Sequence, residues 1–266
     1  MAAEDAELLE RCLSFEIGLE RGACESVEAS GWGEVFLSPS LPLVWHASWI
    51  LVEEEGLGAA QVAALADEAL GGAGFLHRTV VVRDADEGRR LRPGFAALEG
   101  WEVERNLFMV WRGAPDREPE VATAERRHAE VDGLRRAMIT GDISLSGPRT
   151  AETVQQLLEW ERRIGVAGGD RWFVAAADGE PASACRLLAA DGVGQVEDVG
   201  TLSAARQRGL ARAVTLAAAR ASRADGHRLT FLTALADDWP RLIYAKLGFE
   251  PVGEIYEFRR RPPAGS

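Results

Sequence analysis

The sequence predicts an α/β (α+β) fold made of two related lobes, of which the first is shortened at its front. The order strand, glycine turn, helix, strand, helix, Gly-aromatic pair, strand occurs twice along the 266 residues. The Gly-aromatic pairs are Gly100-Trp101 and Gly248-Phe249, and such self-similarity indicates a duplicated unit. A segment rich in Pro, Gly and charge separates the copies, as linkers do. We therefore place the first lobe at 1–112, the linker at 113–119 and the second lobe at 120–266.

Hydrophobic periodicity predicts the elements of the first lobe. Apolar residues on one side of 4–20 indicate an amphipathic helix, and the acidic residues of this region are expected to form a solvated face. The apolar run 43–52 predicts a buried strand, followed by a helix over 59–70 and a strand over 79–82. A Pro-interrupted segment then leads to a last strand at 107–111.

The second lobe is predicted to begin with a strand and two helices and to continue as a series of strands. Asp178-Gly179 is a good turn dipeptide between the strands of a hairpin. The expected strands are 120–125, 172–176, 181–189, 193–202 and 229–233, and the expected helices are 129–139, 151–164, 210–224 and 239–247.

Composition excludes several classes of protein. A net charge of −12 and a pI of about 4.9 argue against a general nucleic-acid or membrane-surface role. No apolar run approaches the ~20 residues of a membrane span. Three unevenly spaced cysteines and four histidines show no disulfide or metal-ligand pattern, so we expect no metal site. The cysteines fit a reducing cytosol and the acidic N-terminus lacks a signal-peptide shape, which predicts a cytoplasmic protein.

The stretch 193–212 has the features of an anion site. An apolar strand is followed by a short Arg- and Gly-rich turn and by a long Ala-rich helix. The first amides of a helix lack internal partners, and the helix dipole is positive there. Gly209 and Ala211 carry almost no side chain, so a pyrophosphate can approach the backbone, and Arg206, Arg208 and Arg212 add positive charge.

This stretch resembles the acyl-CoA-binding motif of the GNAT superfamily of N-acetyltransferases. In that motif Arg or Gln, two residues, Gly, one residue, and Gly or Ala follow a strand, and Arg206, Gly209 and Ala211 fill the fixed positions. Downstream, Tyr244 precedes Gly248-Phe249 with the spacing of the family's Tyr and Gly-Phe signature. The resemblance covers roughly residues 120 to 260. It implies a mixed, mostly antiparallel sheet flanked by helices in each lobe.

The resemblance implies an acetyl-CoA-dependent N-acetyltransferase that acts on an amine of a small molecule or peptide. The backbone of Val199, Gly200 and Thr201 would pair with the pantetheine arm of acetyl-CoA. The family often has Asn seven residues before the tyrosine, where Asp237 stands here, and this carboxylate is a further candidate contact of the arm. The residues expected to bind the pyrophosphate are Arg206, Gln207, Arg208, Gly209, Leu210, Ala211 and Arg212.

Two residues are candidates for proton transfer. Neighbouring strand residues point to opposite faces, so only one of Glu197 and Asp198 can face the thioester, and Glu197 is our choice as general base. The alternatives are a surface or loop-bonded carboxylate, with ordered water as the base. Tyr244 is the candidate general acid, and its alternative is a packed helix aromatic.

The first copy is expected to be inactive, because Glu53-Glu54-Glu55 replaces its Arg-rich turn and Ala96 replaces its tyrosine. Three carboxylates at a helix start repel a pyrophosphate. Binding of a different ligand by this lobe stays open. Two alternatives to an enzyme remain, a non-catalytic acyl-CoA-binding or sensing module and an interaction scaffold. The sequence leaves the acceptor and the oligomeric state open, a homodimer included.

Overall fold

The computed structural model describes residues 3–142 and 150–262, and within them eleven strands form one continuous sheet. The order across the sheet is β1-β2-β3-β4-β11-β5-β10-β9-β8-β7-β6. Pairing is antiparallel except between β3 and β4 and between β9 and β10. This is the mixed, mostly antiparallel sheet that was expected, but the two lobes share it. The strands are β1 (Ser26–Ser30), β2 (Gly33–Leu37), β3 (Trp49–Val52), β4 (Arg78–Val82), β5 (Trp101–Trp111), β6 (Thr123–Arg126), β7 (Arg171–Ala177), β8 (Glu180–Ala190), β9 (Val193–Thr201), β10 (Leu229–Leu235) and β11 (Phe249–Arg260).

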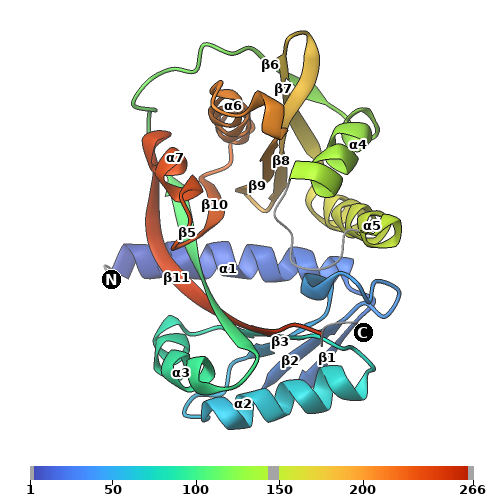
Figure 1. The fold of residues 1–266 in the computed structure, drawn as a ribbon. Helices are drawn as coiled ribbons and strands as arrows, with labels where there is room; N and C mark the ends of the chain where they lie inside the picture. The colour runs from blue at the N-terminus through green and yellow to red at the C-terminus, as the bar shows by residue number, and fades with distance from the viewer. Residues whose placement is uncertain (1–2, 143–149, 263–266) are drawn as a thin grey trace.

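Two groups of helices cover the sheet, and a single helix, α1, crosses the middle of the molecule between them (Figure 1). Pi-helical turns at Asp67–Gly71 and Met138–Asp142 extend α2 and α4. The helices are α1 (Ala3–Ala23), α2 (Ala59–Ala66), α3 (Ala85–Ala97), α4 (His128–Ala137), α5 (Ala151–Gly168), α6 (Leu210–Ala224) and α7 (Pro240–Lys246).

The last strand of each half is exchanged with the other half. β11 pairs with β5 from Phe249↔Trp111 to Arg260↔Trp101, and it also pairs with β4 of the first half. β5 in turn pairs with β10 of the second half. Figure 1 shows β5 and β11 running side by side from one helix group to the other. The exchange joins the two lobes through backbone hydrogen bonds as well as through side-chain packing.

The repeated Gly-aromatic pair has the same structural role in both halves. Gly100 and Gly248 both adopt positive φ, 78° and 88°, immediately before the central strands β5 and β11. Other residues adopt this conformation at a cost, so glycine favours the turn. At Gly248 a side chain would also be too close to the linker, because an added Cβ would lie 2.8 Å from the carbonyl oxygen of Gly113. The structure therefore confirms the duplication predicted from these two positions.

Helix α1 lies across the centre of the molecule, between the two helix groups (Figure 1). Its buried face includes Leu9, Cys12, Leu13 and Ile17, spaced at three to four residues as in an amphipathic helix. This face packs on a core drawn from both halves, which includes Phe36, Trp49, Phe108, Phe231 and Ile255. The helix is therefore part of the interface between the lobes and lies close to any site formed there.

Three expectations for the first lobe were wrong or incomplete. Only Trp49–Val52 of the run 43–52 is a strand, since Trp45–Ala47 forms a 3-10 turn closed by the Ala47 N–H donating to the Val44 carbonyl at 2.9 Å. Continuous burial without a period does not distinguish a buried turn from a strand. The hairpin of β1 and β2 was missed because β1 is exposed and polar. The Pro-interrupted segment is helix α3, which accommodates Pro93 and is capped by the Asp84 carboxylate.

Candidate functional site

Strands β9 and β10 start as a parallel pair and then separate. Their pairing runs only from Val193↔Leu229 to Gln195↔Phe231, after which β10 continues along β5. The register between β8 and β9 shifts opposite Asp198, which has a φ of 53°, so β9 is bulged at this point. The edge of β9 that faces β10 is thus open beyond Gln195, and an extended ligand with amide groups can add to it as a strand would.

The corresponding strands of the first lobe stay together. β3 and β4 pair from Ile50↔Val80 to Val52↔Val82, and the Arg83 N–H donates a further bond to the Val52 carbonyl at 3.1 Å. Backbone hydrogen bonds therefore occupy the edge that is open in the second lobe. This difference adds a geometric reason to the electrostatic one for expecting the first copy to be inactive.

The loop after β9 leads directly into helix α6. Gln207 and Gly209 have positive φ of 65° and 78°, and α6 begins at Leu210, whose side chain is buried in the core of the second lobe. An added Cβ on Gly209 would meet no atom within 4 Å, so the backbone here is open to a ligand. The first-turn amides of Leu210, Ala211 and Arg212 point out of the helix start, where an anion is stabilised.

The arginines of this loop have partners in the structure. Arg208 pairs with Asp178 at 2.7 Å and Arg212 with Asp116 at 2.5 Å, while Arg206 Nε donates to the Thr201 carbonyl at 3.4 Å. Exposed ion pairs contribute little stability. A pyrophosphate, with more charge than one carboxylate, can therefore compete with Asp178 and Asp116 for Arg208 and Arg212.

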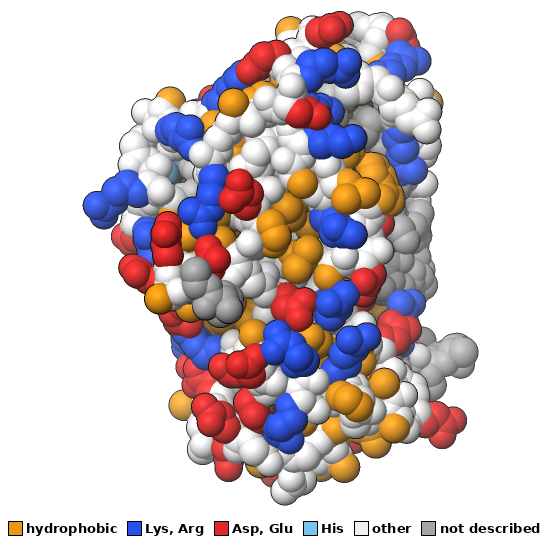
Figure 2. Space-filling view, turned by 90° about the vertical axis from the view of Figure 1, so that its left-hand side faces the viewer, with side chains coloured by type: hydrophobic (Ala, Val, Ile, Leu, Met, Phe, Trp, Pro, Cys, Tyr) orange, Lys and Arg blue, Asp and Glu red, His pale blue; other side chains and the backbone are white. Residues whose placement is uncertain are grey.

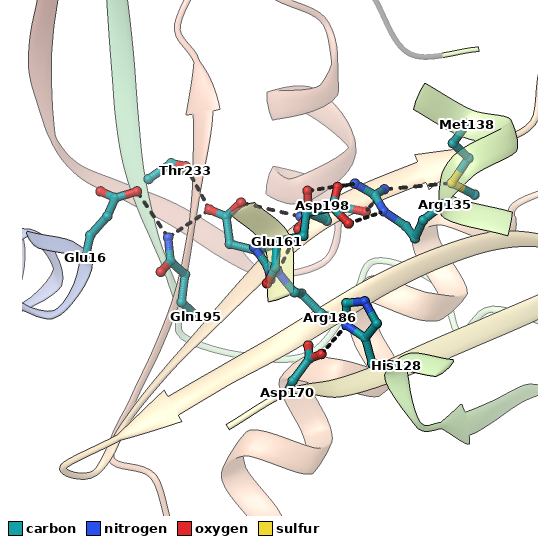
Figure 3. A network of polar contacts seen from close by, with 11 residues as sticks. Glu16, His128, Arg135, Met138, Glu161, Asp170, Arg186, Gln195, Asp198 and Thr233 are labelled. Carbon is teal, nitrogen blue, oxygen red and sulfur yellow. Dashed lines mark hydrogen bonds and ion pairs between the residues drawn. The ribbon is translucent and has the colours of Figure 1, made fainter. Parts of the chain in front are cut away.

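Two buried arginines hold the bulge of β9 (Figure 3). Arg135 of α4 donates to both carboxylate oxygens of Glu161, at 2.6 and 3.2 Å, and to Asp198 at 2.9 Å. Arg186 of β8 pairs with the other Asp198 oxygen at 2.6 Å. Burial raises the pKa of Asp198, but Arg186 and Arg135 outweigh burial and hold the pKa below its ordinary value. Asp198 is therefore an ionised anchor of the strand and a poor proton acceptor at neutral pH.

Glu197 has a different environment from its neighbour. Its carboxylate accepts hydrogen bonds from Gln195 Nε2 at 2.8 Å and Thr233 Oγ1 at 3.4 Å. Burial, followed by repulsion from Asp198, raises the pKa of Glu197 to about 7. A carboxylate that titrates near neutral pH is suited to accept a proton and release it again. These surroundings favour Glu197 over Asp198 as the candidate base.

Tyr244 lies on α7 with its ring half-buried against the core of the second lobe. The ring packs edge-on against Phe249, with centroids 6.4 Å apart. Burial raises the pKa of the Tyr244 hydroxyl, and the charge of Glu197 raises it further, so the hydroxyl keeps its proton at neutral pH.

Asp237 lies apart from the other candidates. It follows β10, is exposed, and pairs with Arg105 of β5 at 2.7 Å. The assignment of Asp237 to the pantetheine arm stays a prediction.

A cavity of about 200 Å³ lies beside Glu197 and is built from both halves of the chain. Its walls come from α1, the 3-10 turn before β3, α4 with its π-turn, α5, β8 and β9. The acidic residues of the first helix were expected to face solvent, but Glu16 and Glu20 line this cavity. The residues that contribute polar or charged groups are Glu16, Glu20, His46, Arg135, Glu161, Arg186, Gln195, Glu197 and Asp198.

Sequence reasoning missed Arg135, Glu161 and Arg186 as well as the two α1 carboxylates. Arg186 left a signal, because it is a charged residue inside the apolar strand 181–189. A charge in such a position is seldom buried unless it is paired. Glu16 and Glu20 left no such signal, since a carboxylate beside an apolar stripe is equally compatible with solvent and with a cavity.

Residues 168–251, which include the open strand edge, the loop and Tyr244, match the family described as Acetyltransferase (GNAT) domain. Residues 168–251 are a GNAT acetyltransferase domain. The match contains Arg206, Gly209, Ala211 and Tyr244, on which the resemblance was based. No curated protein sequence matches the chain.

Solved structures share the fold over nearly the whole chain, beyond the limits of the GNAT domain itself. A GCN5-related N-acetyltransferase from Kribbella flavida has a TM-score of 0.64 at 21% identity and covers 96% of both chains. A functionally unknown conserved protein from Staphylococcus epidermidis has a TM-score of 0.64 at 13% identity, covering 89% of this chain and 93% of its own. A tandem GNAT protein from the clavulanic acid biosynthesis pathway has a TM-score of 0.53 at 16% identity, covering 100% and 98%. The tandem arrangement of this chain is therefore one that other proteins adopt.

Among the residues that the structure describes, no group of His, Cys, Asp and Glu could hold a metal ion. Over the same residues, no helix is long and apolar enough to cross a membrane. On the face drawn in Figure 2, basic and acidic side chains are interspersed and form no continuous basic patch.

Proposed function

We propose that the chain is an acetyl-CoA-dependent N-acetyltransferase that acts on a primary amine. The observation that carries the proposal is Glu197, a carboxylate with a pKa of about 7 that lies between a cavity and the open edge of β9. Acetyl-CoA fits the second lobe because an open strand edge leads into a helix start with an unobstructed glycine. The backbone of Val199–Thr201 would hold the pantetheine arm, and the loop 206–212 the pyrophosphate.

The residues of the site can move both protons that the reaction requires. An amine enters mainly as its ammonium form, and Glu197 accepts a proton to give the neutral nucleophile. A bond forms between the amine nitrogen and the acetyl carbonyl carbon while the carbon–sulfur bond breaks. Tyr244 donates its proton to the departing sulfur and regains the second proton that the nitrogen releases as the amide forms, while Glu197 releases its proton to solvent. The net products are the N-acetyl amine, the free thiol and one proton.

Release of free thiol from acetyl-CoA, measured with a panel of primary amines, tests the proposal. We expect thiol to appear in proportion to acetylated amine, with both products confirmed by mass spectrometry. Acetyl-CoA binding without thiol release from any amine would instead favour a non-catalytic acyl-CoA-binding module.

The activity should depend on pH through Glu197. Because burial raises the pKa of this group, its basic form is lost as the pH falls, and kcat/KM should rise with pH through about 7. Glu197→Gln should lower kcat by roughly 10²-fold and remove the rise of kcat/KM with pH, since glutamine accepts no proton. The measurement is a pair of pH–rate profiles with the same amine, so that the ionisation of the amine cancels. If kcat/KM of Glu197→Gln rises with pH as in the wild type, another group is the base.

A further inference from the structure

The cavity of about 200 Å³ beside Glu197 is the place we assign to the acceptor amine, and we call it the acceptor cavity. Its carboxyl groups divide into two groups. Glu161 and Asp198 are neutralised by Arg135 and Arg186, in the network described above. Glu16, Glu20 and Glu197 have no ion-pair partner among the residues that the structure describes. Since burial lowers the pKa of His46 to about 4, this histidine is neutral at pH 7 and supplies no compensating charge. The cavity therefore holds three carboxyl groups without a cationic partner, and burial raises the pKa of each of them. A bound cation would stabilise their ionised forms.

Two of these unpaired carboxylates come from consecutive turns of α1. Glu16 and Glu20 are four residues apart, so they lie on one face of the helix. One amide group, Gln195 Nε2, donates both to Glu16 at 3.2 Å and to Glu197 at 2.8 Å. Figure 3 shows Gln195 turned toward Glu16. Glu16 is thus linked to the candidate base through the side chain of Gln195, and Glu20 follows one helical turn later on α1.

A second cavity, of about 160 Å³, lies next to the first. Glu16 and Glu20 line both cavities. The indole of Trp49 lines the second cavity and is 3% exposed. Within the described part of the chain its Nε1–H makes no hydrogen bond of normal geometry, although it lies close enough to Glu20 to oppose the rise in the pKa of that carboxyl. An unpaired buried donor is costly. The second cavity is therefore suited to a polar occupant, such as the far end of a ligand or water, rather than to an apolar one.

We propose that the acceptor is a compact aliphatic diamine, with one amine at Glu197 and the second, as an ammonium, between Glu16 and Glu20. The inference rests on the proposed acetyl transfer and names its substrate class. One amine would lie at the base and the ammonium would pair with the α1 carboxylates, which accounts for buried carboxyl groups that have no cationic partner. Cavities of this size suit a chain of a few atoms and exclude a large acceptor from the enclosed part of the site. On this account the first half of the chain selects the acceptor, while the second half holds acetyl-CoA.

Calorimetric titration with butane-1,4-diamine and with butylamine tests the inference without requiring turnover. The two probes share the chain and one amine, so only the second cation differs. The wild-type protein should bind the diamine at least about 30-fold more tightly, the scale of one well-placed ion pair in a partly buried site. Equal affinities for the two probes would overturn the inference.

Glu16→Gln should reduce this preference to about threefold or less, because it removes one of the two charges that hold the second ammonium. Burial and repulsion from Glu197 raise the pKa of Glu16 to about 8, so glutamine resembles the carboxyl of the free protein and the fold should be kept. A bound ammonium favours the ionised carboxylate, which glutamine cannot supply. The matched control is Glu7→Gln, the same change at an exposed position of α1, and it should keep the full preference. An unchanged preference in Glu16→Gln, or its loss in Glu7→Gln, would contradict the assignment of Glu16.

The thiol-release assay with the same two amines separates this inference from the proposed function. Thiol release with both amines at similar kcat/KM would overturn the diamine preference and leave acetyl transfer standing. Selective binding of the diamine without thiol release would support the cation site and contradict acetyl transfer.

Discussion

Gly209→Glu is expected to weaken acetyl-CoA binding severely while the protein remains folded. The substitution places a carboxylate at the start of α6, where the pyrophosphate would lie against the backbone. Repulsion between close charges near a protein surface is worth about 4 kcal/mol. Affinity should therefore fall by about 10²-fold or more. Calorimetric titration with acetyl-CoA gives the affinity and the number of sites.

Strain must be separated from repulsion in this variant. Gly209 has a φ of 78°, so any other residue costs roughly 1–2 kcal/mol there, although an added Cβ meets no neighbour. A thermal melt should show this modest loss of stability. The matched control is Gly58→Glu at the start of α2, the corresponding helix of the first lobe, where φ is −77°. Gly58→Glu should leave acetyl-CoA affinity unchanged, and weaker binding in this variant would mean that the first lobe also contributes to the site.

Tyr244→Phe is expected to lower kcat by roughly 10²-fold with little change in acetyl-CoA affinity. The change removes one oxygen and keeps the ring that packs on Phe249. A positioned acid contributes on this scale, and an interaction made only in the transition state appears in kcat more than in KM. Steady-state thiol release provides the rates. If the variant keeps more than about half of the wild-type kcat, far above the level expected for a lost acid, Tyr244 has a packing role only.

The duplication was predictable from the sequence because local rules determine it. Gly100 and Gly248 are needed for the same left-handed turn, and Gly209 for the open approach at α6. The strand exchange was not predictable. A strand after Gly248 satisfies the same local pattern whether it returns to its own lobe or enters the other, and only the packing of Tyr256 and Phe258 in the first lobe's core distinguishes the two.

The candidate site was predictable where backbone chemistry defines it and not where distant segments meet. The loop 206–212 has its own signature of arginine, glycine and alanine. The acceptor cavity depends on α1 lying across the sheet beside β9, a contact between residues such as Glu16 and Gln195 that are far apart in sequence. The bulge at Asp198 likewise depends on arginines from α4 and β8.

Hydrogen–deuterium exchange with and without acetyl-CoA tests the central claim most directly. The claim is that acetyl-CoA adds to the open edge of β9, whereas β3 and β4 of the first lobe leave no such edge. Saturating acetyl-CoA should slow exchange at the amides of 199–201 and of 207–213 and leave 50–58 unchanged. Slower exchange in 50–58, or none at 199–201 despite saturation, would contradict the claim.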